Sequence, residues 1–178
     1  MDDSAAVQRC LAGDPEAFRT LVERYQARAL AHAIAINRNR DDARDVVQEA
    51  FLNAHRALRT FDRERAFYPW FYAILRNCCY RQLASRRTDA TDGEMRVDLL
   101  ESPGVSVEER LAIEEALAAL APADREIVML RHFDGLSYAE LAAALDIPAG
   151  TVMSRLFNAR KRLRESLARG SAPERKTE

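Results

Sequence analysis

Hydrophobic residues in the first half of the chain recur three and four positions apart in three successive stretches, which is the spacing of amphipathic helices. Asp14 and Pro15 stand where the first stretch needs an N-cap and a first helical residue. Asp41 or Asp42 is expected to cap the second stretch, and the third begins near Pro69. Helices closing on these stripes predict a small bundle. The expected buried positions are Phe18, Leu21, Val22 and Tyr25, then Val47, Phe51, Ala54 and Leu58, and then Phe71, Ile74, Leu75 and Cys78.

This periodicity is lost in the middle of the chain. From residue 88 to residue 107, turn-forming Asp, Gly, Ser and Pro appear with net negative charge, which predicts a flexible linker. Helical spacing returns after it, and residues 171–178 are expected to form a disordered tail. No stretch of useful length alternates like a β-strand. We therefore expect an all-α protein with two small helical domains, at residues 1–87 and 108–170, joined by that linker.

The second domain contains the spacing of a helix-turn-helix, in residues 135–165. Ser137 and Glu140 form a capping box that starts a short helix. Asp146 stands at a sharp turn, where left-handed backbone is needed, and Pro148 presets the first turn of a longer helix. The residues expected to face inward are Leu141, Ala142 and Leu145 from the short helix, and Val152, Leu156, Ala159 and Leu163 from the long one.

A helix-turn-helix of this kind places the N-terminal part of its second helix in the major groove of DNA. Thr151, Ser154, Arg155 and Asn158 are expected to face the groove, and Arg131 to reach a phosphate or a base. An ordinary helical hairpin with a solvated basic face has the same periodicity. The capping box and the sharp turn, together with the basic residues that follow them, favour DNA binding.

Composition agrees with a soluble, largely helical protein, because 48% of the 178 residues are hydrophobic and 31% are charged. No stretch approaches the length of a transmembrane helix, and the acidic start MDDSAA is unlike a secretory signal. We therefore expect a cytoplasmic protein with no membrane insertion.

The formal net charge of −1 conceals a segregation of charge along the chain. Residues 76–87 contain four arginines and no acid, and residues 155–164 contain five basic residues and no acid. Residues 89–101, between them, contain five acids against Arg96. Clustered Lys and Arg supply most of the affinity for phosphates, so both basic patches indicate a nucleic-acid partner.

Aromatic residues are concentrated at the start of the first basic patch. Six of the thirteen aromatic residues lie within fourteen positions, in FYPWFYAILRNCCY at residues 67–80. Rings that stack on unpaired bases beside arginines that hold phosphates are typical of single-strand binding. Phe67 and Tyr68 are expected on a loop before the helix, and Tyr72 and Tyr80 on the face opposite the buried stripe. For these four rings, either a core role or a base-stacking role fits the sequence.

The three cysteines form no disulfide framework and no metal-binding spacing. Cys78 and Cys79 point about 100° apart on a helix, so one is expected to be buried and the other half-exposed. An enzyme with a cysteine nucleophile would need a suitably placed histidine, but the three histidines are scattered along the sequence. We therefore expect no cofactor, no metal site and no cysteine-based catalysis.

In their order and spacing, these motifs resemble the sigma-70 family of bacterial RNA polymerase specificity factors, in its small extracytoplasmic-function (ECF) group. GDPEAFRTLVERY and DDARDVVQEAFLNAHRAL are similar to the family's polymerase-binding region 2, and AFYPWFYAILRN to its −10-reading segment. APADRE and LSYAELAAALDIPAGTVMSR are similar to region 4, which reads the −35 element. A stand-alone regulator using only the helix-turn-helix is the main alternative, but it leaves the first domain unexplained.

The resemblance implies a non-catalytic initiation factor that binds core RNA polymerase, reads the −35 and −10 elements and assists DNA melting. The implied partners are the largest-subunit clamp and the second-largest subunit's flap, promoter DNA and an anti-sigma factor. The implied clamp-binding residues are Asp45, Gln48 and Glu49. The implied −10 residues are Phe67, Tyr68, Arg76, Asn77, Tyr80, Arg81, Arg86 and Arg87. The implied −35 residues are Arg131, Thr151, Met153, Ser154, Arg155, Phe157, Asn158, Arg160 and Lys161.

Three positions depart from the family pattern. Met153 and Asn158 stand where the family often has basic residues, which alters the −35 bases that can be read, since Met makes apolar contacts and Asn favours adenine. The family also commonly places an acid a few positions after Asn77, but the next residues here are Cys78, Cys79, Tyr80 and Arg81.

Overall fold

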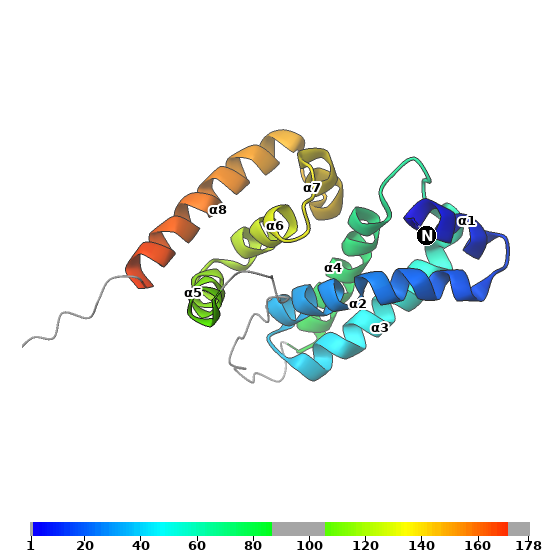
Figure 1. The fold of residues 1–178 in the computed structure, drawn as a ribbon, viewed down its shortest axis with the longest axis horizontal. Helices are drawn as coiled ribbons and strands as arrows, with labels where there is room; N and C mark the ends of the chain where they lie inside the picture. Colours follow the sequence, from blue (N-terminus) through cyan, green and yellow to red (C-terminus); the bar gives the residue numbers. More distant parts are fainter. Residues whose placement is uncertain (1, 87–105, 171–178) are drawn as a thin grey trace, which may run out of the picture.

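The computed structural model describes residues 2–86 and 106–170, with residues 86 and 170 described by their backbone alone. Within these ranges the chain forms eight α-helices and one short 3-10 helix, and no strand (Figure 1). The expected all-α class is therefore confirmed. Most of the expected linker and the whole C-terminal tail lie outside the described residues.

The first domain is built from four α-helices, which are α1 (Asp3–Leu11), α2 (Pro15–Asn37), α3 (Arg40–Ala57) and α4 (Phe67–Arg86), with the 3-10 helix η1 (Leu58–Thr60) after α3. As expected, Asp14 caps α2 and Pro15 is its first residue. The expected cap of α3 is wrong, because Asn39 Oδ1 accepts the backbone N–H groups of Asp41 and Asp42. The two aspartates lie in the first turn, where their charges favour the helix dipole.

The core of the first domain lies between α2, α3 and α4, and the buried stripes expected from the sequence form it. The rings of Phe51 on α3 and Phe71 on α4 stack with their centroids 4.4 Å apart. Of the expected core positions, Val22 and Ile74 are half-buried and pack against the cluster. The buried ones are Phe18, Leu21, Tyr25, Val47, Phe51, Ala54, Leu58, Phe71, Leu75 and Cys78.

The second domain contains α5 (Val107–Ala118), α6 (Pro122–His132), α7 (Tyr138–Leu145) and α8 (Ala149–Gly170). Ser106 and Glu109 make a capping box at the start of α5, so this helix begins inside the range expected for the linker. Ser137 and Glu140 make a second capping box, and Asp146 ends α7 in the left-handed conformation with φ 54°. The expected helix-turn-helix is therefore present as α7 and α8.

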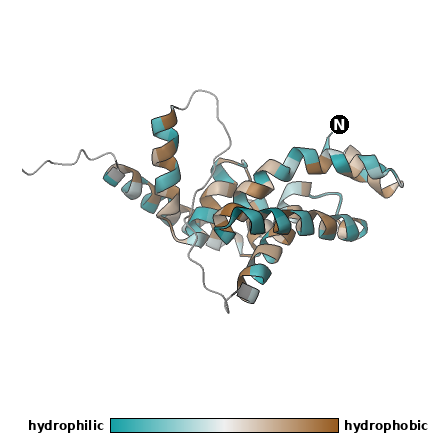
Figure 2. Ribbon diagram, turned by 90° about the horizontal axis from the view of Figure 1, so that it is seen from below, coloured by the Kyte–Doolittle hydropathy of each residue, from teal (hydrophilic) through white to brown (hydrophobic). Residues whose placement is uncertain are grey.

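The two domains pack against each other through α6 and α7. Figure 1 shows α6 and α7 between the first domain and α8, which forms an outer edge of the molecule. Hydrophilic and hydrophobic residues alternate along the helices, as Figure 2 shows, in keeping with amphipathic helices that bury one face. None of the helices in the described parts of the chain is both long enough and apolar enough to span a bilayer.

Candidate functional site

The outer face of α8 exposes both large apolar side chains and polar side chains to solvent. Val152, Leu156 and Ala159 are buried on the inner face, as the sequence predicts. On the outer face, Met153 is 62% exposed and Phe157 is 65% exposed, which is unusual for side chains of this size in water. Of the other expected −35 residues on this helix, Ser154, Asn158 and Lys161 are exposed, while Thr151, Arg155 and Arg160 are half-buried.

The basic side chains around this face differ in their contacts. Among the described residues, Arg155 has no hydrogen-bond or ion-pair partner, so its guanidinium is available to a ligand. Arg160 Nε donates to His132 Nε2 across 3.1 Å. Burial, with the charges of Arg160 and Arg131, lowers the pKa of His132, which favours the neutral ring that this hydrogen bond needs. Arg162 pairs with Asp124.

Arg131, which the sequence predicts to contact DNA, makes structural contacts within its own domain. Its Nη1 donates to the carbonyl oxygen of Leu136 across 2.6 Å, and its guanidinium lies 5.3 Å from the ring centroid of Tyr138. These contacts hold the loop between α6 and α7 in place ahead of the helix-turn-helix. A DNA contact by Arg131 stays a prediction.

The loop from Asp62 to Ala66, between η1 and α4, is exposed and borders a cavity of about 440 Å³. Arg63 and Arg65 on the loop line this cavity, together with Arg24 of α2. Acidic residues at the N-terminal end of α1 line its other side. The site therefore places arginines beside a hollow large enough for a planar group, with Arg65 paired to Asp62 and Arg24 to Asp3.

Phe67 and Tyr68 do not belong to this loop, contrary to the sequence-based expectation. They are the first two residues of α4, and only 1% and 4% exposed. The Phe67 ring centroid lies 5.8 Å from that of Tyr25, and the Tyr68 centroid lies 4.9 Å from the same ring. The faces of both rings are packed against other side chains of the core, so neither ring is accessible to a base in this structure.

Tyr72 is also buried, although the sequence places it on the outward face of α4. Its hydroxyl donates to Glu126 Oε1 of α6 across 2.9 Å, so the second domain covers it. Arg76, one turn later, donates from Nε to the same oxygen across 2.9 Å. The outward-face assignment of Tyr72 is therefore wrong in this structure, because periodicity within one domain cannot reveal what the other domain covers.

Farther along α4, Asn77, Tyr80 and Arg81 are exposed. The guanidinium of Arg76 lies 4.8 Å from the ring centroid of Tyr80, and Arg81 pairs with Glu49 of α3. The side chain of Arg86 and the whole of residue Arg87 lie outside the described residues. The first basic patch thus presents Asn77, Tyr80 and Arg81 to solvent, and Arg76 to the other domain.

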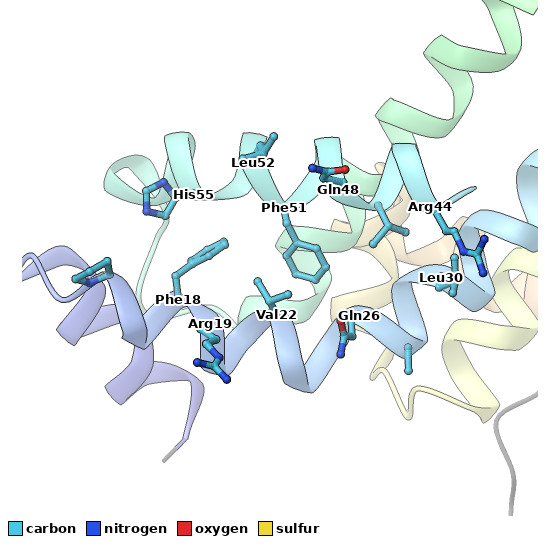
Figure 3. A pocket seen from close by; sticks show the side chains of 13 residues that line it. Phe18, Arg19, Val22, Gln26, Leu30, Arg44, Gln48, Phe51, Leu52 and His55 are labelled. Atoms are coloured by element: carbon cyan, nitrogen blue, oxygen red, sulfur yellow. The ribbon is translucent and has the colours of Figure 1, made fainter. Parts of the chain in front are cut away.

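An apolar groove of about 840 Å³ runs between α2 and α3 (Figure 3). Its floor is apolar, and Leu52 on its edge is 51% exposed. Gln48 lies on the rim of the groove, and Asp45 and Glu49 are exposed neighbours of it on α3. The apolar lining residues are Pro15, Phe18, Val22, Ala27, Leu30, Val47, Phe51 and Leu52.

Sequence reasoning missed this groove, because residues such as Val22, Val47 and Phe51 were assigned wholly to the core. An exposed leucine on the polar side of a helix is the signal that could have revealed it.

Both cysteines of the pair on α4 are buried, so the expectation of one half-exposed thiol is wrong. Burial raises the pKa of Cys79 to about 12, helped by the charges of Cys78 and Glu126. Burial also raises the pKa of Cys78. A thiol with a raised pKa is a poor nucleophile and a poor metal ligand. No group of three or more His, Cys, Asp or Glu residues in the described ranges could hold a metal ion.

Two family models match the chain. The model described as Sigma-70 region 2 matches residues 21–88, and the model described as Sigma-70, region 4 matches residues 110–163. The chain is 39% identical over 176 residues to the ECF RNA polymerase sigma-E factor of Escherichia coli strain K12. This match covers 90% of this chain and 92% of that protein.

Two solved structures have a similar fold over most of the chain. CnrH, solved in complex with the cytosolic domain of CnrY, has a TM-score of 0.71 and 26% identity, and the match covers 96% of this chain and 99% of that one. The sigma factor RpoE of Bartonella quintana, solved in complex with the anti-sigma factor NepR, has a TM-score of 0.71 and 27% identity. That match covers 85% of this chain and 96% of the other.

Proposed function

Because the chain belongs to the sigma-70 family, as an ECF RNA polymerase sigma factor that directs transcription initiation, we propose that its two domains bind separate promoter elements. Residues 1–87 would form the −10 and polymerase-binding domain, and residues 108–170 the −35-binding domain. The sigma factor itself is not an enzyme, so its residues act by binding and positioning rather than by chemistry.

The exposed face of α8 is the observation that carries the −35 assignment. Arg155 has no partner among the described residues, and Ser154 and Asn158 stand beside it on the outward side. Arginine and asparagine are suited to hydrogen bonds with purine edges in the major groove. Met153 and Phe157 offer apolar surface to the methyl groups of thymines. We therefore assign −35 reading to this face, with Lys161 contacting phosphate.

The −10 strand is assigned to the Asp62–Ala66 loop and to the exposed side of α4. Asn77, Tyr80 and Arg81 are accessible there, and Arg63 and Arg65 border the neighbouring cavity. One unpaired base enters that cavity, and a second stacks on Tyr80. Phe67 and Tyr68 support this site from the core, since their burial leaves no ring face for a base.

We assign the binding of core RNA polymerase to the groove between α2 and α3. Its apolar floor suits the hydrophobic side of a polymerase clamp helix, and the Gln48 rim suits polar and basic side chains at the edge. Asp45 and Glu49 add negative charge on the same helix, which would steer a basic partner. Contact of the second domain with the polymerase flap is proposed from the family alone.

An anti-sigma partner is proposed from two relatives. CnrH was solved with the cytosolic domain of CnrY, and RpoE of Bartonella quintana with the anti-sigma factor NepR. We propose that a protein of the same kind binds this chain, and that the complex is cytoplasmic, where RNA polymerase works.

A gel shift with a labelled duplex promoter tests the function directly. The chain alone is expected to give no specific shift, and the chain with purified core polymerase is expected to give a heparin-resistant shifted complex. A stand-alone regulator would instead shift the duplex specifically without polymerase, and that result would overturn the proposal.

A further inference from the structure

We propose that His132, the last residue of α6, is a positioning residue for −35 binding, because it holds the guanidinium of Arg160 on α8 in an orientation that contacts a phosphate of the −35 duplex. His132 lies outside the helix-turn-helix formed by α7 and α8, and neither the sequence motifs nor the family resemblance gives it a role. The proposal rests on the proposed −35 role of the exposed face of α8.

The contact between the two side chains decides which end of the guanidinium stays available. Arg160 Nε donates to His132 Nε2 across 3.1 Å, and no other hydrogen bond or ion pair of the Arg160 side chain occurs among the described residues. The N–H groups of Nη1 and Nη2 therefore remain available. These two nitrogens form the end of an arginine that can bind a phosphate through two parallel hydrogen bonds.

Arg160 also lies where a phosphate contact is expected. It comes three residues after Phe157, which is 65% exposed, so the two side chains are neighbours on the helix surface. It follows the buried Ala159 and is itself half-buried, which places it at an edge of the exposed face of α8. When a helix lies in the major groove, the middle of its exposed face meets the bases and its edges approach the phosphate backbones.

His132 can act as the acceptor because its ring is neutral. Burial and the charges of Arg160 and Arg131 lower its pKa, so the ring is uncharged at neutral pH. Because Nε2 accepts a hydrogen bond, the neutral ring carries its proton on Nδ1. Arg131 is held elsewhere, by the carbonyl oxygen of Leu136 and the ring of Tyr138. The acceptor of His132 is thus left to Arg160.

A second arginine of α8 shows why a neutral partner matters. Arg162 pairs with Asp124 of α6, whose side chain is 8% exposed. A carboxylate neutralises the charge of an arginine and occupies N–H groups that a phosphate would use. A neutral imidazole removes no charge, so Arg160 keeps its attraction for phosphate. Helix α6 therefore holds Arg162 by a charge that cancels its own, and Arg160 by one acceptor that leaves its charge in place.

Holding Arg160 before DNA arrives strengthens binding. A flexible arginine loses side-chain freedom when a phosphate fixes it. His132 removes part of that freedom in the absence of DNA, so less is lost on binding. We place no DNA contact on His132 itself, and its whole effect on the −35 duplex is therefore exerted through Arg160.

The test is a double-mutant cycle in the holoenzyme. The probe is a fluorescent duplex that carries a −35 element found by run-off transcription of genomic DNA and ends upstream of the −10 element, so that melting does not contribute. Anisotropy measures the Kd of this probe for wild type, His132→Ala, Arg160→Ala and the variant with both substitutions. Circular dichroism and native gels check that the four chains have equal helix content and bind core polymerase equally.

Arg160→Ala is expected to weaken binding about tenfold and to lower the slope of log affinity against log salt by about one. His132→Ala is expected to weaken binding about fivefold when Arg160 is present, and by less than about twofold in the Arg160→Ala background. His132→Gln is the conservative variant, since its amide oxygen can accept from Arg160 in place of Nε2. Its Kd is expected to stay within about twofold of the wild-type value.

Lys161 provides the matched control cycle. It is exposed, follows Arg160 directly and is proposed to contact phosphate, but it makes no hydrogen bond to His132 in the described structure. Lys161→Ala is therefore expected to weaken binding by the same factor in the wild-type and His132→Ala backgrounds. Coupling of His132 to Lys161 as strong as its coupling to Arg160 would count against the specific contact.

Equal losses from His132→Ala in the presence and absence of Arg160 would overturn the proposal, because they would show a general effect on the fold. A loss in His132→Gln as large as that in His132→Ala would also overturn it, as would an Arg160→Ala holoenzyme that binds like wild type. Failure of the −35 assignment itself is detected separately, since Arg155→Ala would then leave binding of the probe unchanged. If Arg155→Ala weakens binding but the cycle shows no coupling, then only the role of His132 is wrong.

Discussion

Arg125 Nη1 of α6 donates a hydrogen bond to the carbonyl oxygen of Ala35 in α2, across 2.9 Å. The same buried side chain donates to the carbonyls of Leu117, Ala118 and Leu120, at the C-terminal end of α5. Burial lowers the pKa of Arg125 to about 10, which leaves it charged at neutral pH. One guanidinium therefore closes the end of α5 and also joins the two domains.

Arg125→Lys is expected to lower the free energy of unfolding by about 3 kcal/mol, because an ammonium cannot reach all four carbonyls and leaves some unpaired. Urea unfolding followed by circular dichroism measures this change. The exposed substitution Arg164→Lys on α8 is the control and is expected to change little. Equal effects of the two substitutions would contradict the role given to Arg125.

Arg155→Ala is expected to weaken transcription from −35-dependent promoters, to weaken promoter binding by about 1–3 kcal/mol and to relax the preference for the −35 base that it contacts. Binding to core polymerase is expected to stay unchanged. Run-off transcription on promoters with single −35 substitutions measures the loss and the change in base preference, and a core-binding assay measures binding to the polymerase. Arg169→Ala, near the end of the same helix, is the control, and a matching loss of core binding in Arg155→Ala would contradict the assignment.

Gln48→Ala combined with Leu52→Ser is expected to weaken core polymerase binding about tenfold or more, since it removes an exposed apolar anchor and a rim group from the groove. Both side chains are exposed, so the fold is expected to stay intact. Arg56→Ala with Arg59→Ser, outside the groove, is the control. A native-gel competition for core enzyme measures the difference, and equal competition by both variants would contradict the groove assignment.

Phe67→Ala is expected to destabilise the first domain by about 3–5 kcal/mol, because the ring fills the core between Tyr25, Phe61 and Phe71. Thermal unfolding measures this loss. A stable Phe67→Ala protein with a specific melting defect would show instead that the ring turns outward to hold a base.

The double variant Arg63→Ala with Asn77→Ala tests promoter melting without disturbing the hydrophobic core of the first domain, because both positions are exposed. We expect closed complexes to form and the permanganate reactivity of −10 thymines to fall. Arg59→Ala, an exposed arginine of η1 that the −10 assignment does not use, is the control. Unchanged reactivity in the double variant would place the melting site elsewhere.

Cys79 is expected to resist alkylation in the native chain. Its pKa of about 12 means that at pH 8 only about one thiol in ten thousand is ionised. Because a raised thiol pKa moves ionisation to higher pH, reactivity should increase only as the pH approaches that value. Iodoacetamide labelling followed by mass spectrometry measures this, with Cys10 as the more accessible internal comparison. Rapid labelling of Cys79 at pH 8 would contradict its burial.

The helix-turn-helix could be predicted in detail because its determinants are local. Ser137 and Glu140 cap each other three residues apart, and Asp146 adopts the left-handed turn that its place requires. The Asp14 cap and the Phe51 and Phe71 core positions followed from short spacings in the same way.

The errors arose where the deciding contact is distant in sequence. Tyr72 lies on the outward face of α4 by periodicity, yet Glu126, in the other domain, binds and covers it. Phe67 was expected on a loop because helices often begin at a proline, but its packing against Tyr25 and Phe61 extends α4 by two residues before Pro69. Helix α1 was missed because its buried apolar side is formed by little more than Ala6 and Val7.

Run-off transcription with purified core polymerase on a genomic DNA library tests the central claim most directly. Adding the chain is expected to give discrete transcripts whose start sites share one −35 and one −10 sequence, and Arg155→Ala is expected to reduce them. Transcripts no different from those of core polymerase alone would contradict the account.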